Sequence, residues 1–440
     1  MKKNFLFLFV FLTISCFAQF SKTHYIPPLT AQTLMAEDQY LYISTPNKTN
    51  INVKIIEIGG AILNRVVSNT SPYVHYIGNG DNSQLCTTKT SIGKINNKGY
   101  IIEAEDLVYV SVRLNAALNN TRGYNHAGGL VSKGNSALGT LFRLGAMLNP
   151  NVDPTLLNFA SILATENNTK VTISNIPVGT VFSDGTIYTV PIDITLNKNE
   201  SYVLALENYS GNNIPSNSSK MIGTLVKSDK SVVVNSGSMG GNNSTQNGRD
   251  VGFDQIVSYE KTGKEYIFVK GIGNDDIERV LLIAHNPNTI IYLNGSATPF
   301  AVLGNPGDFV AIDGSQFSNG NLYVTTSENI FAYQSIGGSA SPANQNLFFV
   351  PPLNCATPNS VDTIPLIESI GNITFDGGLN IVTETGAIVK VFENGISVSV
   401  ESATAITGNP GFERYSVSGL TGNVSVKSTK QVYVSYLWIK

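Results

Sequence analysis

Residues 167–173 read Asn-Asn-Thr-Lys-Val-Thr-Ile, and this stretch decides the fold that the sequence predicts. Asn167 and Asn168 form a turn signal, and Thr169 opens a run in which β-branched and polar residues alternate, as in a half-buried strand. Thr49 and Thr289 also follow Asn-rich turns and open strand-like runs, and the two intervals are both 120 residues. We therefore predict an internal repeat with a strand beginning at each of these threonines.

A second repeated pattern is a β-branched or aromatic strand near the end of each unit, which occurs four times. The four strands are Leu107–Val110, Val232–Val234, Ile330–Tyr333 and Val432–Val434. A short polar segment precedes each strand, and we predict that it is a turn that delivers the chain into that strand. These segments are Glu105-Asp106, Ser228-Asp229-Lys230, Ser327-Glu328-Asn329 and Ser428-Thr429-Lys430. The pattern indicates units of about 100–120 residues.

The predicted fold is all-β. Short runs of Val, Ile, Tyr, Phe and Thr are separated by Asn, Gly, Ser and Pro clusters, and pairs such as Asn294-Gly295 and Asn394-Gly395 favour type I′ hairpin turns. We expect a tandem array of about four β-sandwich-like units, and a closed propeller-like arrangement is the alternative. The predicted units are residues 19–118, 119–240, 241–346 and 347–440.

The N-terminus predicts export. Lys2 and Lys3 precede the apolar run Phe5–Ile14, and small residues around Ala18 complete the pattern of a cleaved secretory signal peptide, residues 1–18. A lipoprotein signal with Cys16 as the lipidated residue is the alternative. The apolar run is too short to span a bilayer, and no later stretch is long and apolar enough, so no transmembrane segment is predicted. The expected location is secreted or on the outer cell surface.

The charge balance indicates which partners to expect. Only 13% of the residues are charged, and the net charge is −3. A nucleic-acid partner requires clustered Lys and Arg to neutralise phosphates, and a polybasic membrane anchor requires a similar cluster. The composition argues against both of these partners.

Cysteine usage leaves one question open. Removal of the signal peptide with Cys16 would leave Cys86 and Cys355. A disulfide between them is possible in an exported protein, and closing so long a loop would stabilise the fold by about 5 kcal/mol in the chain-entropy model. Two unpaired, partly buried thiols are an equally good interpretation, because a chain of this length can fold stably without a covalent cross-link. No Cys/His spacing indicates a metal site.

The order of several motifs resembles the IgGFc-binding domain family, whose members include secreted proteins of Bacteroidetes-type bacteria. Each motif is weak by itself, and their order along most of residues 25–440 carries the resemblance. The matching stretches are Gly99–Val110, Leu156–Ile173 with its Ala164–Thr169 core, Gly252–Ile256, Gly263–Ile267, Val280–Gly295, Gly307-Asp308 and Ala332–Gln334.

The resemblance implies an extracellular binding or adhesion role without enzymatic activity. Bacterial relatives often continue into a C-terminal sorting domain that is linked to gliding motility and type IX secretion. The present sequence ends at Lys440, directly after the last repeated strand. The resemblance therefore does not extend to that domain, and the family name alone does not imply antibody binding.

No catalytic residues and no cofactor are predicted. The four histidines are scattered, and no GxSxG, HExxH or P-loop motif accompanies them. Calcium is the one open alternative, because acidic residues cluster in three places, although none has EF-hand spacing. Caps of surface turns are the simpler interpretation of these carboxylates. The clusters are Asp275-Asp276 with Glu278, Asp250 with Asp254, and Asp81.

Two long Gly/Asn-rich loops, residues 115–134 and 237–252, are the predicted interaction regions, and inter-unit linkers are the alternative interpretation. Tyrosines in polar loops are the best candidates for contacts with a glycan or protein. The candidate interaction residues are Tyr73, Tyr124, Tyr209, His126 and Asn242.

The predicted function is that of a secreted or surface-displayed adhesion or interaction protein with an unidentified protein or glycan ligand. One alternative is a carbohydrate-active enzyme or glycan-binding module of jelly-roll type, and another is a structural spacer of the cell surface. A cleft that gathers two carboxylates, or a histidine with a carboxylate, would favour the enzyme.

Overall fold

The computed structural model describes residues 20–32, 35–115, 126–208, 217–245, 248–337, 345–353 and 357–439. Within these residues the chain is built of β-strands, joined by turns and three short 3-10 segments. The 3-10 segments are η2 (Gly134–Ala137), η3 (Tyr259–Lys261) and η4 (Gly314–Gln316). The predictions of an all-β fold and of tandem β units are confirmed.

We group the strands into four units by the sheets that they form. The first unit contains β1 (Ser21–Ile26), β2 (Leu29–Ala31), β3 (Gln39–Ser44), β4 (Ile51–Glu57), β5 (Ile62–Val67), β6 (Tyr73–Gly78), β7 (Cys86–Thr88), β8 (Gly93–Ile95), β9 (Tyr100–Asn115) and β10 (Ala127–Val131). The second contains β11 (Gly139–Arg143), β12 (Asp153–Ala164), β13 (Thr169–Ser174), β14 (Ile192–Leu196), β15 (Ser201–Asn208), β16 (Leu225–Gly241) and β17 (Asp250–Ile256).

The third unit contains β18 (Gly263–Val269), β19 (Arg279–Ala284), β20 (Thr289–Leu293), β21 (Ala301–Leu303), β22 (Phe309–Asp313), β23 (Asn321–Ser335) and β24 (Phe348–Phe349). The fourth contains β25 (Ser360–Ile364), β26 (Ser369–Ile370), β27 (Ile373–Thr374), β28 (Asp376–Glu384), β29 (Val389–Glu393), β30 (Ile396–Val398), β31 (Thr404–Ala405), β32 (Phe412–Leu420), β33 (Val424–Ser428) and β34 (Val432–Ile439).

The first three units share one strand order. It is β5-β4-β9-β3-β6 in the first, β14-β13-β16-β12-β15 in the second and β21-β20-β23-β19-β22 in the third. The long strands β9, β16 and β23 pair with different neighbours along their two halves. In the fourth unit the equivalent strand is split into β33 and β34, which pair with β29 and β28. The repeat therefore consists of one long strand with partners at both ends.

Each long strand of the first three units bulges at the same place. In the first unit, Ser21 of β1 faces Val108 of β9, and Thr23 faces Glu103. Two residues along β1 therefore correspond to five residues along β9. β11 against β16 and β18 against β23 have the same irregularity. Such a bulge bends the strand and increases its twist, which lets its second half take new partners.

A side chain in each bulge, or in the break between β33 and β34 of the fourth unit, accepts a hydrogen bond from the backbone at or next to the start of the neighbouring strand. This bond recurs in all four units. The pairs are Glu105 with Asn52 N at 2.8 Å, Asp229 with Lys170 N at 2.8 Å, Ser327 with Ile290 N at 2.9 Å and Thr429 with Ile388 N at 3.0 Å. All four acceptors lie in the polar segments that the sequence singled out.

Two details of the predicted repeat are wrong. In the first three units the polar segments are not turns, because they lie inside continuous strands at the bulge. Thr169 and Thr289 begin β13 and β20 as predicted, but β4 begins at Ile51, and Thr49 is an exposed residue of the preceding loop. The repeated hydrogen bond to Asn52 places Ile51 in the position of the two threonines.

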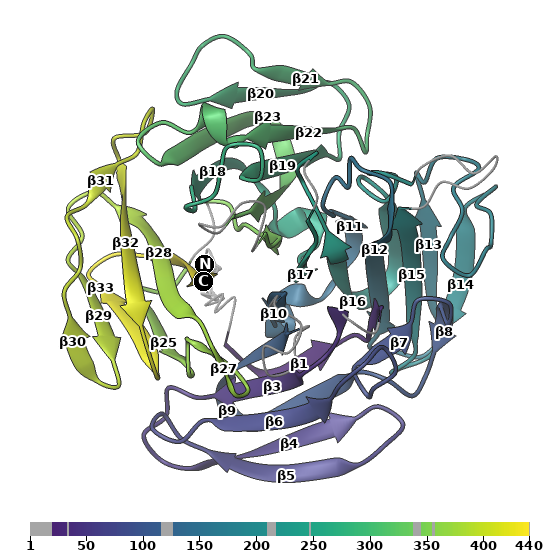
Figure 1. The fold of residues 1–440 in the computed structure, drawn as a ribbon, viewed down its shortest axis with the longest axis horizontal. Helices are drawn as coiled ribbons and strands as arrows, with labels where there is room; N and C mark the ends of the chain where they lie inside the picture. Colours follow the sequence, from purple (N-terminus) through teal and green to yellow (C-terminus); the bar gives the residue numbers. More distant parts are fainter. Residues whose placement is uncertain are drawn as a thin grey trace, which may run out of the picture.

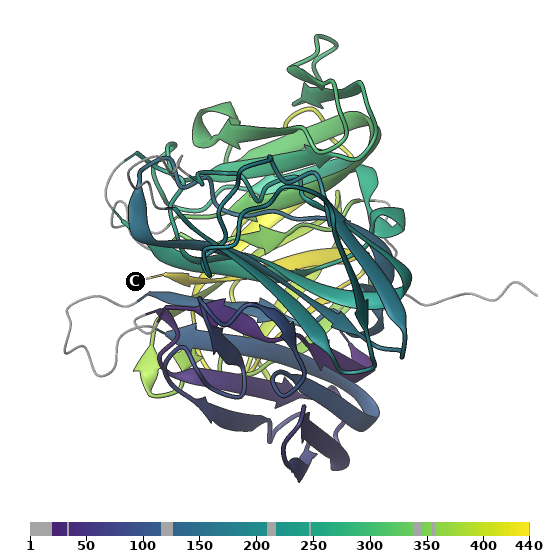
Figure 2. The same cartoon turned by 90° about the vertical axis from the view of Figure 1, so that its right-hand side faces the viewer.

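The four units lie around a common centre, as Figure 1 shows looking down the shortest axis of the molecule. Seen from the side in Figure 2, the first unit (purple) lies below and the third (green) above, with the fourth (yellow) between them. Neighbouring units are joined by strand pairing and by side-chain contacts. β8 of the first unit extends the sheet of the second, and Tyr333 of the third donates to the carbonyl of Arg143 in the second at 2.6 Å.

The fourth unit contacts both the third and the first. Arg414 donates to the carbonyl oxygen of Asn319 at 2.9 Å, and the hydroxyl of Ser44 in the first unit donates to the carbonyl of Thr363 at 2.6 Å. Four apolar cores fill the units, and a smaller cluster lies between the third and fourth. The units therefore form a ring, which corresponds to the closed alternative.

The predicted unit boundary at 118/119 lies outside the described residues, and the boundary at 240/241 falls at the last residue of β16. β10 pairs with β9, and β17 pairs with β16. These two inner strands connect each unit to the one that follows.

Candidate functional site

Three inner strands, β10, β17 and β24, pair with the second halves of β9, β16 and β23. In Figure 1, β10 and β17 lie toward the centre of the ring. β10 approaches β17 so closely that a Cβ atom at Gly128 would lie 2.4 Å from Cγ1 of Val251. Glycine is therefore required at this point of β10, because any other side chain would separate the two strands.

Two aspartates on β17 link the inner strands of the first and third units. Asp250 lies 3.2 Å from Nδ1 of His126, and its other oxygen accepts from the backbone N–H of Gln345 at 3.0 Å. Asp254, four residues further along β17, accepts from Nζ of Lys133 at 2.7 Å and from the backbone N–H of Phe349 at 3.0 Å. Residues four apart on a strand point to the same face, which is why both aspartates reach both neighbours.

The ion pair between Asp254 and Lys133 is buried, with side-chain exposures of 7% and 13%. Burial raises the pKa of Asp254, while the Lys133 ammonium and the backbone donors of Phe349 and Gln255 oppose that rise. A buried carboxylate that accepts this many hydrogen bonds holds the surrounding strands in register, since removal of the Lys133 ammonium would leave the Asp254 charge buried without a counter-charge.

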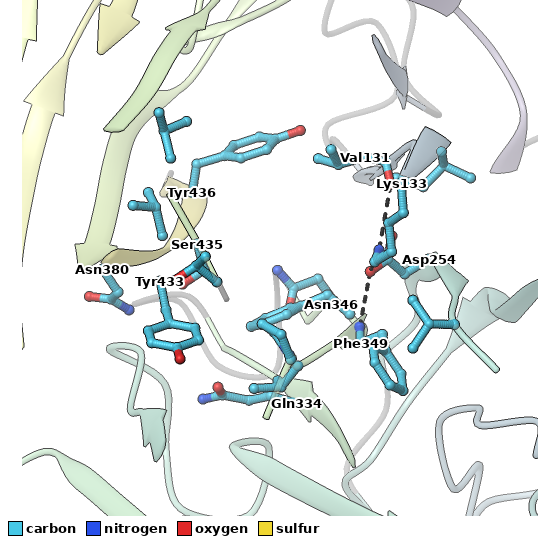
Figure 3. A pocket seen from close by; sticks show the side chains of 18 of the residues that line it. Val131, Lys133, Asp254, Gln334, Asn346, Phe349, Asn380, Tyr433, Ser435 and Tyr436 are labelled. Carbon is cyan, nitrogen blue, oxygen red and sulfur yellow. Dashed lines mark hydrogen bonds and ion pairs between the residues drawn. The ribbon is translucent and has the colours of Figure 1, made fainter. Parts of the chain in front are cut away.

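A cavity of about 430 Å³ lies between the inner strands and the fourth unit. Its wall is mostly apolar and comes largely from the first, third and fourth units, while the second contributes Asp254, whose pair with Lys133 lies on one side (Figure 3). Apolar contributors from these units are Leu130, Val131, Val269, Phe349, Val382 and Val434. Its size and apolar lining are typical of a small-molecule site.

Four amide side chains interrupt the apolar wall: Gln334 of β23, Asn380 of β28, and Gln345 and Asn346 just before β24. Nε2 of Gln334 donates to the carbonyl of Val269 at 2.6 Å. Along β28, Leu379 and Ile381 point into the core of the fourth unit, so the alternation of a strand directs Asn380 and Val382 to the cavity side. Oδ1 of Asn380 accepts from the hydroxyl of Ser416 at 2.8 Å.

A family model described as IgGFc binding protein matches residues 128–437, which is more than half of the chain. This chain belongs to the IgGFc-binding family. The match runs from the first inner strand, β10, to the last strand, β34, and so includes most of the cavity wall.

Two further comparisons indicate neither a function nor a fold for this chain. No curated protein matches the chain. Among solved structures, the crystal structure of a tetra-tandem repeat in the extending region of a large adhesion protein is 13% identical. That alignment covers 95% of this chain and 99% of the other, and its TM-score of 0.10 is too low to indicate a shared fold.

The IgGFc-binding family is a family of binding domains, and the predicted interaction residues of this member lie in different settings. Tyr73 begins β6, is half-buried, and has the Arg65 guanidinium 5.1 Å from its ring centre. His126 contacts Asp250 beside β17. Asn242 is 1% exposed, and its side chain bonds to Ser244, Gln345 and Gly248. Tyr124 and Tyr209 lie outside the described residues.

The acidic clusters that were considered for calcium have protein partners. Asp275 pairs with Lys270, Asp276 accepts from the hydroxyl of Ser244, and Glu278 accepts three backbone N–H groups. Asp81 lies in the loop after β6. Among the described residues there is no group of three or more His, Cys, Asp or Glu side chains that could hold a metal ion.

The thiol of Cys86 is free and fully buried, and Cys355 lies outside the described residues. Burial raises the pKa of Cys86 to about 12. In the part of the chain that the structure describes, no helix is long and apolar enough to cross a membrane.

Sequence reasoning missed Lys133, Gln334 and Asn380 as members of one site. Asn380 carried a signal, since it is the one amide in the strand Leu379–Val382. Nothing in the sequence indicated that this strand faces β10 and β24, which lie in other units.

Proposed function

We propose that this member of the IgGFc-binding family is an exported, non-enzymatic adhesion or interaction protein that binds a protein or glycan outside the cell. The observation that carries the proposal is the family match over residues 128–437, because that family is one of binding domains. The proposal includes export through residues 1–18 and display by a bacterial cell, as in the secreted Bacteroidetes-type members that the chain resembles.

The carboxylates of the cavity support a binding role. Asp254 and Glu260 both line the cavity. Asp254 is held by Lys133 and two backbone donors, and Glu260 accepts from the hydroxyl of Ser258. These are structural bonds, whereas a glycosidase requires a carboxylate pair that is free to exchange protons with substrate and water. Two carboxylates in one cavity are the arrangement that would favour the jelly-roll enzyme, but the bonds that hold both of them support the binding protein instead.

A binding screen tests the proposal. The processed chain, residues 19–440, is presented to immobilised antibody Fc, to mucin and to arrayed glycans. Tyr73→Ala is the test variant, because Tyr73 and Arg65 form an aromatic and cationic surface suited to a sugar ring or a carboxylate. Tyr292→Ala, a half-buried tyrosine of β20, is the matched control.

Saturable binding that Tyr73→Ala weakens and Tyr292→Ala leaves intact supports an interaction protein that uses the first unit. Saturable binding that neither variant changes supports an interaction protein and shows that the ligand contacts residues other than Tyr73. Absence of binding to every surface contradicts the proposal and favours a structural spacer.

A further inference from the structure

Asn380 has an unused hydrogen-bond donor. Its side chain is 4% exposed, and Oδ1 accepts from Ser416. Nδ2 is buried and has no hydrogen-bond partner among the described residues. An unpaired buried amide donor costs about 1–3 kcal/mol, so a folded protein rarely keeps one without a use for it.

The cavity lies next to this donor. Asn380 is part of its wall, and Figure 3 shows the amide nitrogen on the cavity side of the side chain. Val382 on the same strand and Val434 on β34 provide apolar surface beside it. A molecule in the cavity could therefore bury apolar atoms and accept one hydrogen bond at a defined position.

The charges in the wall indicate that the ligand is uncharged. Lys133 is paired with Asp254 at 2.7 Å. The ammonium of Lys261 donates to the carbonyl oxygens of Ser136 and Leu138, at 2.8 and 2.7 Å. A charged ligand would need a counter-charge in this apolar space, and both lysines and the remaining wall carboxylate, Glu260, which accepts from the hydroxyl of Ser258, already bond to protein groups.

We propose that the cavity binds an uncharged, apolar small molecule whose carbonyl oxygen accepts a hydrogen bond from Nδ2 of Asn380. The apolar wall supplies affinity, and the Asn380 donor selects for an oxygen at the β28 end of the ligand. The hydroxyls of Tyr109 and Thr357 also line the cavity without a hydrogen-bond partner among the described residues, and they are further donors for a second oxygen. This site is distinct from the outer surface that the binding screen tests, so either proposal can fail while the other stands.

The test uses the purified processed chain and an uncharged dye, Nile red, whose fluorescence rises in apolar surroundings and which carries a ring carbonyl. Two competitors, fluorenone and fluorene, then displace it. They have the same ring system, and fluorenone has a carbonyl where fluorene has a methylene. We expect saturable one-site binding of Nile red, and we expect fluorenone to displace it at a concentration roughly fivefold lower than fluorene, the value of one net hydrogen bond.

Three variants locate the effect. Asn380→Leu keeps the size of the side chain and removes the donor, so the preference for fluorenone should disappear. Val434→Trp fills the cavity and should abolish dye binding. Asn64→Leu, the same change at an exposed position on β5, should alter nothing. Circular dichroism and the urea midpoint confirm that each variant is folded.

The inference is overturned if Nile red shows no saturable binding, if Val434→Trp leaves its binding unchanged, or if wild-type protein prefers fluorene. The comparison of the two competitors on wild-type protein does not depend on any variant. This comparison therefore tests the preference for a carbonyl oxygen even if Asn380→Leu does not fold.

Discussion

Nη1 of Arg113, near the end of β9, donates a hydrogen bond to the carbonyl oxygen of Leu366 at 2.7 Å, across 253 residues of sequence. The same guanidinium donates to the carbonyls of Ser369 and Pro365 at 2.9 and 2.7 Å, and it lies 3.9 Å from the ring centre of Tyr42. Arg113 is fully buried. One side chain of the first unit thus satisfies three backbone acceptors of the fourth and closes the ring.

Replacing Arg113 by Met should destabilise the whole ring. The change removes a charged donor from three carbonyl oxygens, of which only that of Leu366 keeps a backbone donor among the described residues, Ser369 N–H, so we expect the free energy of unfolding to fall by about 3 kcal/mol. Urea unfolding followed by tyrosine fluorescence measures the loss. Arg65→Met is the control, because Arg65 lies on an outer strand, where it donates to the adjacent carbonyl of Asn64 and packs over the ring of Tyr73. Equal stability of the two variants would show that the ring does not depend on Arg113.

His24 should make stability depend on pH. Its Nε2 lies 3.0 Å from the carbonyl oxygen of Val108 and its Nδ1 lies 3.0 Å from the hydroxyl of Ser132. Complete burial lowers the pKa of His24 to about 4, while these carbonyl contacts oppose the shift. Between pH 6.5 and pH 4 the unfolded chain binds a proton that the folded chain does not bind.

The contribution of neutral His24 is therefore fully present above about pH 6.5, and it is lost as the pH falls toward 4, with a total near 3 kcal/mol. Free energies of unfolding measured by urea at several pH values give the slope. His24→Gln should remove this part of the slope. Parallel profiles for the variant and the wild type would contradict the assignment to His24.

Cys86 should be unreactive while the protein is folded. Its thiol is free and buried, and its pKa is raised to about 12, so the thiolate that reacts with disulfide reagents is scarce. In a Cys16→Ser, Cys355→Ser background, Ellman's reagent should label no thiol under native conditions and one thiol in denaturant. Rapid native labelling would show that the site around Cys86 opens.

Asp229 should contribute through the repeated bulge. Its carboxylate accepts from the backbone N–H of Lys170 at 2.8 Å. Asp229→Ala leaves that donor to water, and we expect a loss of about 1 kcal/mol in the free energy of unfolding. Asp81→Ala, in the loop after β6, is the matched control and should change stability by less than about 0.5 kcal/mol. A loss of the same size in both variants would mean that the repeated bond contributes nothing specific.

The repeat could be found in the sequence because it is local. Thr169 and Thr289 each follow an asparagine with a positive φ, Asn168 at 55° and Asn288 at 56°, and asparagine tolerates that conformation better than most residues. The strands that follow alternate in burial as their residues alternate in polarity. Turn preferences and side-chain alternation depend on only a few neighbouring residues, so they can be recognised in the sequence.

The long strands could not be predicted from the same signals. Glu105-Asp106 and Ser228-Asp229-Lys230 are typical of turns, yet they lie inside β9 and β16. The residues before and after each segment pair with neighbouring strands, which keeps the backbone extended, and the polar side chains bond to the neighbouring strand. Tertiary pairing therefore overrides the local turn preference.

By itself, the sequence determined that the chain is all-β, that it repeats, and where some strands begin, such as β13, β20 and β34, because strand alternation and Asn/Gly turns depend on adjacent residues. Only the tertiary structure decided that the ring closes through Arg113 and that Asp254 and Asn380 face one cavity. Those groups come from units separated by one hundred residues or more. Whether these groups come into contact depends on how each bulged strand orients the next unit. That orientation results from many packing contacts together, so no short sequence pattern reveals it.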